Sequence, residues 1–319
     1  MNKRFIFLLL TFTGLFFIAS GQETSNNTSN TVKKEEEPEF SFGNISPVIL
    51  GQGGIEASTV QDLTSYWVTS KYGTRVVDRY RISRFDSNLN LQVGLDANKR
   101  WDIGVQLKYG RIRLDENSRN SPFKIFAAND AFSTAFNGLS AAGFRIRTTP
   151  FKNNQAFTLQ GSCFFPLLKD KDTRAALNAD RVQTDFAGTY FVSLNRSNDL
   201  YLYAQGRYTL LISNHENNKS NHFPGISVLL VKSFFDQTLF VFPGLSYTGS
   251  YQQNYAGGRL NKQGDFVFAS LGAQVRITSG LTIFANTQRP WIYRSGVNIY
   301  SDLVKNSYSD WALGLRLVL

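Results

Sequence analysis

From residue 53 to the C-terminus, segments of alternating polar and apolar residues recur, and the connections between them alternate strictly in length. A period of two is typical of a β-strand with two different faces. The short connections are residues 97–100, 152–155, 195–199, 236–237 and 280. The long connections are residues 68–79, 116–138, 169–181, 213–222, 253–264 and 294–307. A soluble sandwich or propeller gives no reason for every second turn to be tight.

The segments predict twelve strands. They lie near residues 53–67, 80–96, 101–115, 139–151, 156–168, 182–194, 200–212, 223–235, 238–252, 265–279, 281–293 and 308–319. Barrels that cross an outer membrane combine an even strand number with short periplasmic turns and long extracellular loops. The sequence therefore predicts an all-β fold, a transmembrane antiparallel up-and-down β-barrel of about 12 strands, with its loops arranged in this way.

The two faces of the predicted strands differ in polarity. From residue 88 to 95, Leu, Leu, Val and Leu alternate with Asn, Asn, Gln and Gly. Twelve strands enclose a lumen too wide for such polar side chains to fill without water, so we expect the polar face inside and the apolar face toward lipid. Aromatic residues near both strand ends, among them Trp101, Trp311, Tyr66 and Tyr308, predict interfacial belts. A soluble secreted β-protein is the alternative fold.

The first 40 residues differ from the rest. Lys3 and Arg4 precede an apolar run that ends in the small residues Ala19-Ser20-Gly21, which predicts a signal peptide over residues 1–21. An N-terminal membrane anchor is the alternative. Residues 22–40 are polar, with five glutamates, and predict a disordered periplasmic leader. Residues 41–319 would form the barrel, located in the cell outer membrane.

The charge and cysteine content narrow the function further. The chain has a net charge of +10, and the basic excess lies in the barrel region because the leader is acidic. A single cysteine, Cys163, excludes an internal disulfide and zinc sites built on several thiolates. We expect no nucleic-acid partner.

The C-terminal segment DWALGLRLVL presents one apolar face, ending in Leu319. It resembles the terminal strand by which the barrel-insertion machinery recognises outer-membrane barrels, although that strand commonly ends in an aromatic residue. The final Leu319, in place of an aromatic residue, and Gln22 directly after the signal peptide are features that resemble a Bacteroidota-type barrel. The resemblance, over residues 53–319, is to bacterial outer-membrane β-barrel proteins of porin-like architecture. It implies contacts with outer-membrane lipid, lipopolysaccharide and the insertion machinery.

Continuing the strand parity places six basic residues in the lumen. They are Lys108, Arg145, Arg147, Arg207, Arg276 and Arg316. The acidic residues Asp102, Asp185 and Asp310 share that side. A charged ring in a pore selects ions of opposite sign, so these residues are candidate selectivity residues. The alternative is an internal network in which the same residues pair with carboxylates.

Two long connections contain more than polar loop residues. The connection over 116–138 carries four phenylalanines, Phe123, Phe126, Phe132 and Phe136, which would be costly to expose as one patch. We expect it to constrict the lumen, to form a short helix on the rim, or to dock a partner. The segment KDTRAALNADR predicts a short surface helix with Asp172 as its N-cap.

No constellation of residues predicts catalysis. The two histidines, His215 and His222, lie in one polar connection and are interpreted as solvent-facing, although they could bind a metal weakly. The glycines of GQGG at 51–54 lack the lysine of a phosphate-binding loop. Two groups, Asp115-Glu116-Asn117 and Asp170, Asp172 and Asp180, resemble calcium loops only loosely. We therefore predict no enzyme, no catalytic or cofactor-binding residue, no cofactor and no metal.

The leading functional hypothesis is a small porin-like channel that passes small polar or anionic solutes. The first alternative is a structural or accessory barrel with a closed lumen in an outer-membrane protein complex. A barrel hydrolase is a second alternative, which the positions of the histidines disfavour.

Overall fold

The structure is a computed structural model that describes residues 48–72, 75–117, 119–129, 131–151, 156–212, 219–254, 258–295 and 301–319. The predicted signal peptide and leader, residues 1–40, lie outside these ranges. His215 and the predicted turn at 152–155 lie outside them as well.

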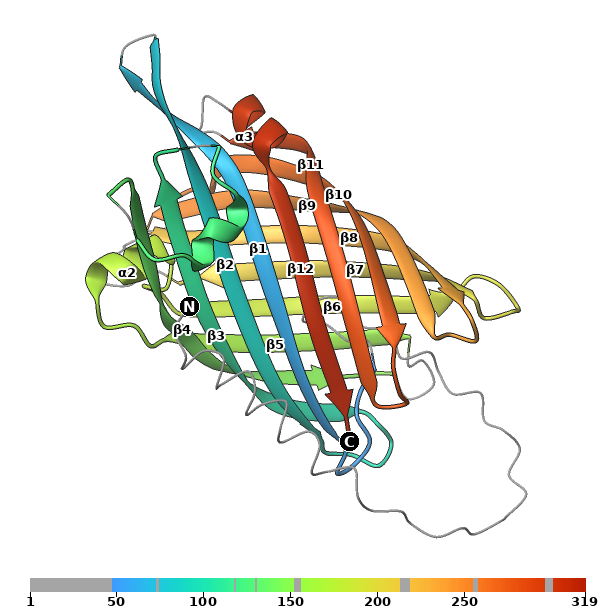
Figure 1. Cartoon of the computed structure of the whole chain (residues 1–319). Helices are drawn as coiled ribbons and strands as arrows, with labels where there is room; N and C mark the ends of the chain where they lie inside the picture. Colours follow the sequence, from blue (N-terminus) through green and yellow to red (C-terminus); the bar gives the residue numbers. More distant parts are fainter. Residues whose placement is uncertain are drawn as a thin grey trace, which may run out of the picture. The chain divides into compact units, whose positions relative to one another are not determined.

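Twelve antiparallel strands close into a barrel (Figure 1). They are β1 (Ile55–Tyr72), β2 (Arg75–Gly94), β3 (Trp101–Asp115), β4 (Ser133–Thr148), β5 (Phe157–Pro166), β6 (Gln183–Ser193), β7 (Leu200–Leu211), β8 (Lys219–Phe234), β9 (Leu239–Asn254), β10 (Asn261–Arg276), β11 (Leu281–Ser295) and β12 (Ser309–Val318). Each strand pairs with the next along the chain. The predicted fold class and strand number are confirmed.

The barrel closes where β12 pairs with β1. Val318 lies opposite Glu56, and the backbones of Leu319 and Ile55 exchange hydrogen bonds of 2.8 and 3.1 Å. This closure satisfies the backbone groups that would otherwise line two open edges of the sheet.

The outer wall of the barrel is apolar. Leu91 on β2, Val105 on β3, Leu271 on β10 and Leu313 on β12 are all exposed. Their strand neighbours on the opposite face are polar or small, and Gln92 is fully buried. A water-soluble barrel would place the apolar face inside. The outer wall is therefore a lipid-facing surface.

The strands at the long-loop end extend further than the sequence pattern predicts. β1 continues to Tyr72, β2 already begins at Arg75, and β4 already begins at Ser133. At this end the outward face also carries polar residues, such as Arg113 and Asp115, so the contrast between polar and apolar parity that marks a membrane strand fades there. The connections predicted over 68–79 and 116–138 are correspondingly shorter.

Three short helical segments connect strands at this end: η1 (Pro122–Phe126), α2 (Lys171–Ala176) and α3 (Ser301–Ser307). The helix predicted in KDTRAALNADR is α2, but the prediction of Asp172 as its N-cap is wrong. The Thr173 amide donates to the Asp170 carboxylate at 2.8 Å, because the helix begins two residues earlier than predicted. In the part of the chain that the structure describes, no helix is long and apolar enough to cross a membrane.

Candidate functional site: the barrel lumen

A buried charge network fills one side of the lumen at the short-turn end. It consists of Glu56 on β1, Asp102 on β3, Arg147 on β4 and Arg316 on β12. The Arg147 guanidinium lies 2.8 Å from the Asp102 carboxylate and 3.6 Å from that of Glu56. The Arg316 guanidinium lies 3.0 Å from Glu56. All four side chains are buried, so their charges compensate one another rather than facing water.

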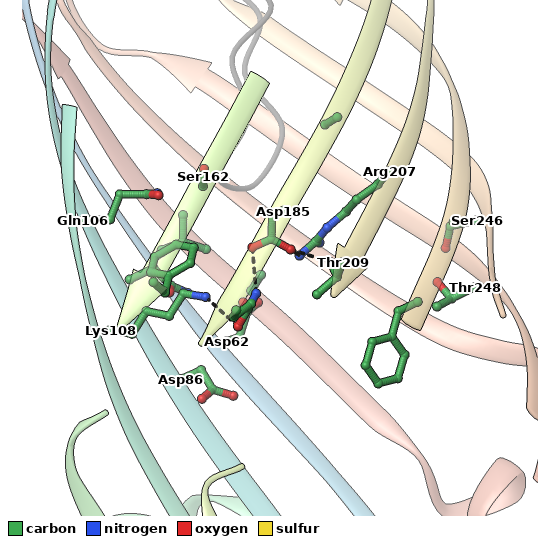
Figure 2. Close-up of a pocket in the computed structure, with 18 of the residues that line it drawn as sticks. Asp62, Asp86, Gln106, Lys108, Ser162, Asp185, Arg207, Thr209, Ser246 and Thr248 are labelled. Carbon is green, nitrogen blue, oxygen red and sulfur yellow. Dashed lines mark hydrogen bonds and ion pairs between the residues drawn. The ribbon is translucent and has the colours of Figure 1, made fainter. Parts of the chain in front are cut away.

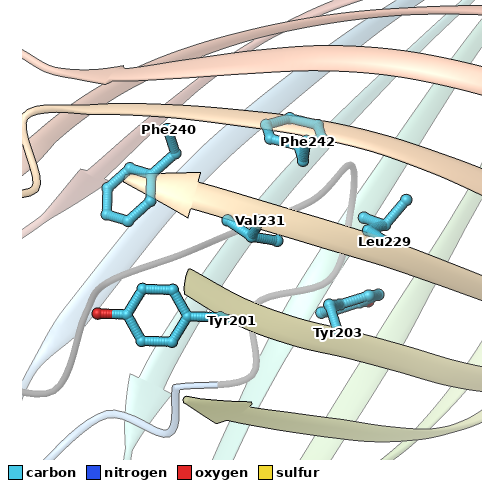
Figure 3. Packing of buried hydrophobic residues seen from close by; sticks show 6 residues of the cluster. All are labelled: Tyr201, Tyr203, Leu229, Val231, Phe240 and Phe242. Atoms are coloured by element: carbon cyan, nitrogen blue, oxygen red, sulfur yellow. The ribbon is translucent and has the colours of Figure 1, made fainter. Parts of the chain in front are cut away.

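An aromatic cluster fills the opposite side of the lumen at the same end (Figure 3). Its members come from β7, β8 and β9: Tyr201, Tyr203, Leu229, Val231, Phe240 and Phe242. A glycine on the neighbouring strand β10 makes room for one of the rings. Gly272 lies directly opposite Phe242, and a Cβ atom on it would come within 1.9 Å of that ring.

The residues that precede β1 lie against this closed end. Ile49 and Leu50 are buried, and the Leu50 amide donates to the Asp102 carboxylate at 3.4 Å. The short-turn end of the lumen is therefore occupied by the charge network, the aromatic cluster and the segment 48–50.

Beyond the filled end, toward the long loops, the lumen contains a cavity of about 610 Å³ (Figure 2). Five basic residues line it: Arg84, Lys108, Arg145, Arg181 and Arg207. Four acidic residues line it as well: Asp62, Asp86, Asp185 and Asp310. The cavity is thus strongly charged but nearly balanced.

Several of these charges are paired within the cavity wall. Arg84 contacts Asp86 at 2.5 Å, and Arg207 contacts Asp185 at 3.3 Å. Lys108 is held differently, since its ammonium donates to the Gln183 side chain at 3.2 Å and lies 3.4 Å from the Phe164 ring centroid.

The acidic side of the cavity combines carboxylates with aromatic rings. The Asp310 carboxylate accepts hydrogen bonds from Thr64 at 3.0 Å and Tyr308 at 3.2 Å. Tyr308 stacks on Tyr66 with 6.2 Å between ring centroids. The belt prediction is wrong for these two tyrosines: they share the inward parity of Asp62 and Asp310, whereas the prediction used only their distance from the strand ends.

The connection between β5 and β6 reaches into the long-loop end of the barrel. Leu177, which follows α2, is buried and lines the cavity, and its carbonyl accepts a hydrogen bond from Arg84 at 3.3 Å. Asn178, Ala179 and Arg181 line the same cavity. This connection therefore borders the cavity at that end.

The phenylalanine-rich connection between β3 and β4 lies on the outer wall instead. Ile125 of η1 is fully buried against Leu63 and Phe85, which share the outward parity of their strands. Phe123 packs on the outward Trp311 with 5.8 Å between ring centroids. In Figure 1 this green turn lies in front of β2.

None of the four phenylalanines is among the described residues that line the cavity. Phe126 is the last residue of η1, Phe132 is exposed, and Phe136 lies within β4 opposite Ile112. A role in narrowing the lumen would require another position of η1, and a docking role stays a prediction.

The six basic residues predicted in the lumen divide into groups. Lys108, Arg145 and Arg207 line the cavity, and Arg147 and Arg316 belong to the charge network. Arg276 is the last residue of β10, opposite Thr282 at the short-turn end. Their role in ion selectivity stays a prediction.

Sequence reasoning missed Asp62, Asp86, Arg84 and Glu56 as lumen residues. The parity rule would have placed Arg84 and Asp86 there, because each lies an even number of residues from the polar positions of residues 88–92. No inward position was recognised on the first strand, so Asp62 and Glu56 had no such reference. The sequence also contained a signal for the filled short-turn end of the lumen. Residues 239–242, LFVF, are apolar on both faces, which is not expected of a strand whose inner face meets water.

The sequence predicted that His222 is a solvent-facing loop residue, but it lies within β8. Its Nδ1 atom lies 2.5 Å from the Tyr208 hydroxyl. Because the strand begins at Lys219, the polar connection is shorter than predicted. The described residues contain no group of three or more His, Cys, Asp or Glu side chains placed to hold a metal ion.

No protein-family model and no curated protein matches the sequence. Among solved structures, the barrel is similar to an outer membrane channel from Pseudomonas putida F1, with a TM-score of 0.60 and 12% identity over 88% of this chain and 100% of that chain. For the β-domain of the Bordetella autotransporter BrkA the TM-score is 0.49 and the identity is 11%, over 84% of this chain and 100% of that chain. For the translocator domain of the autotransporter NalP from Neisseria meningitidis the TM-score is 0.45 and the identity is 12%, over 84% of this chain and 88% of that chain.

At these identities the similarity concerns the fold. The similarity covers nearly the whole described barrel, and the outer wall of that barrel is apolar as a membrane requires. The closed twelve-stranded topology, the lipid-facing wall and this structural similarity show that the chain has the fold of an outer-membrane β-barrel protein.

Proposed function

We propose that this protein is an outer-membrane channel for small polar solutes. The observation that carries the proposal is the cavity of about 610 Å³ inside the barrel, lined by nine charged side chains and by further hydroxyl and amide groups. A polar space of this size holds water, and cavities of ~300–1,000 Å³ are typical of small-molecule sites. The similar solved channel from Pseudomonas putida F1 supports the proposal at the level of architecture.

In this proposal, the described structure is the closed state of the channel. A solute in the cavity faces the charge network and the aromatic cluster at the short-turn end, where Tyr203, Phe240 and Phe242 are fully buried. Passage therefore requires rearrangement of one of these groups or of the segment 48–50. Truncating one large ring should lower that barrier.

Proteoliposome swelling with the full mature chain tests the proposal. We expect swelling in arabinose or glycine, and faster swelling for Phe242→Ala, which removes a ring from the filled end. Phe235→Ala is the matched control, because Phe235 is 77% exposed in the β8–β9 turn. Impermeability of both the wild type and Phe242→Ala, with folded protein in the vesicles, would contradict a channel.

The filled short-turn end favours a second candidate, a structural or accessory barrel with a closed lumen. In this role the charge network is a permanent seal, and the loops or the leader bind partner proteins of the outer membrane. Persistent impermeability in the swelling experiment is the result that this candidate predicts. Neither role includes a chemical step.

A further inference from the structure

We infer that the cavity binds a dipolar solute, a small molecule that carries both an ammonium and a carboxylate group. The inference rests on the proposed function, since it names the class of polar solute that the channel would take. It follows from how the charges of the cavity are distributed between its walls.

One wall is acidic and aromatic. Asp62 on β1 and Asp310 on β12 both line the cavity. Within the described residues, no hydrogen bond or ion pair engages the Asp62 carboxylate, whereas Asp310 accepts hydrogen bonds from neutral groups, among them the hydroxyls of Thr64 and Tyr308. Phe268, which lines the cavity, packs on Tyr308 with 5.5 Å between ring centroids, so an aromatic ring borders these carboxylates. Carboxylates beside an aromatic ring suit an ammonium group, which is attracted by both.

The other wall presents basic groups. Lys108 on β3 lines the cavity and is held by neutral partners, the Gln183 amide and the Phe164 ring. Arg207 on β7 shares its charge with Asp185, but half of its side chain remains exposed, 51%. Both groups can therefore receive a further carboxylate as a charge-assisted hydrogen-bond acceptor.

The two walls face the same space. In the closed order of twelve strands, β7 is six strands from β1, so Arg207 projects from the side of the barrel opposite Asp62. Lys108 lies on β3, two strands from Asp62, and the register places it one inward position nearer the short-turn end. A small molecule between them meets opposite charges at its two ends.

This arrangement disfavours solutes of a single charge. An anion near Lys108 also meets Asp62 and Asp310, and a cation near Asp62 also meets Lys108 and Arg207. A molecule with both groups satisfies both walls, and its net charge of zero matches a cavity with five basic and four acidic residues. The sequence-based expectation of small polar or anionic solutes counted six basic and three acidic residues in the lumen and did not include Asp62 or Asp86.

Calorimetric titration of the full mature chain in detergent tests the inference with three probes of similar size. They are 4-aminobutyrate, which carries both charges, pentanoate, which lacks the ammonium, and 4-aminobutanamide, which lacks the carboxylate charge. We expect 4-aminobutyrate to bind at least about tenfold more tightly than either analogue, since each analogue loses one charge-assisted contact.

Single substitutions assign the two ends of the probe. Asp62→Asn should weaken binding of 4-aminobutyrate and 4-aminobutanamide, and Lys108→Met should weaken binding of 4-aminobutyrate and pentanoate. Asp172→Asn and Lys171→Met, on the exposed surface of α2, are the matched controls and should leave all affinities unchanged. Heat-modifiable gel migration checks that each variant is folded, and the comparison of probes on the wild type needs no variant.

Equal or tighter binding of pentanoate would overturn the inference, as would weak binding of all three probes. Swelling of vesicles in arabinose under those conditions would still support a channel. Selective binding of 4-aminobutyrate to a protein that passes no solute would support the site and contradict the proposed function instead.

Discussion

Arg147 on β4 and Asp102 on β3 are direct cross-strand partners, 2.8 Å apart, and both side chains are completely buried. A buried arginine is tolerated because its carboxylate partners compensate its charge, and removing one partner leaves an uncompensated charge. The pair therefore links folding of the barrel to closure of its short-turn end.

Asp102→Ala should destabilise the barrel by ~3–5 kcal/mol, the usual cost of breaking a buried ion pair. Urea titration followed by heat-modifiable gel migration measures the change. Asp199→Ala breaks the exposed pair with Lys232, 2.7 Å apart, and should have little effect. Similar unfolding midpoints for the two variants would show that the charge network does not hold the barrel.

Gly314→Ala should also be destabilising, by ~1–3 kcal/mol, because added atoms overpack a filled interior. Gly314 lies opposite Phe284, and a Cβ atom would come within 2.0 Å of that ring. Gly206→Ala is the control, since nothing lies within 4 Å of its Cβ position. Combining Gly314→Ala with Phe284→Leu should recover part of the loss, and additive losses in this double-mutant cycle would refute the contact.

Arg207 and Arg147 should respond differently to a change to glutamate, although both are basic and inward. Arg207→Glu alters the charge of the cavity and should shift the reversal potential in a KCl gradient toward cation preference. Arg147→Glu would place a third carboxylate beside Glu56 and Asp102 and should prevent folding. Lys171→Glu on α2 controls for net charge. An unchanged reversal potential in Arg207→Glu would show that Arg207 does not line the path of the ions.

Ile125→Asn should loosen the contact of η1 with the outer wall, because Ile125 is fully buried against Leu63 and Phe85. We expect faster proteolytic cleavage of the β3–β4 connection, with unchanged conductance, since the cavity lining does not include Ile125. Lys124→Asn, one residue away and exposed, is the control. Increased conductance in Ile125→Asn would instead support the constriction role predicted from sequence.

The barrel was predictable because a membrane constrains each strand separately. The alternation along residues 88–95 indicates which side chains face lipid and which face the lumen, and the short turns indicate which strand ends lie on the same side of the membrane. Neither signal depends on contacts between residues distant in sequence. The inward direction of Lys108 and Arg207 follows from the same local rule.

The pairing inside the lumen was less predictable. Arg316 meets Glu56, 260 residues away in sequence, only because β12 closes on β1, and Arg147 reaches both Asp102 and Glu56. Parity gives the side of a residue but not its depth or its partner on another strand. The position of Ile125 against Leu63 and Phe85 likewise depends on tertiary packing, which the composition of the connection does not specify.

The conductance of single molecules of the purified full chain in a planar bilayer tests the central claim most directly. The channel account predicts rare, brief openings of the wild type, because its short-turn end is filled, and more frequent openings of Phe242→Ala. A complete lack of conductance in both proteins, each shown to be folded and inserted, would contradict the account.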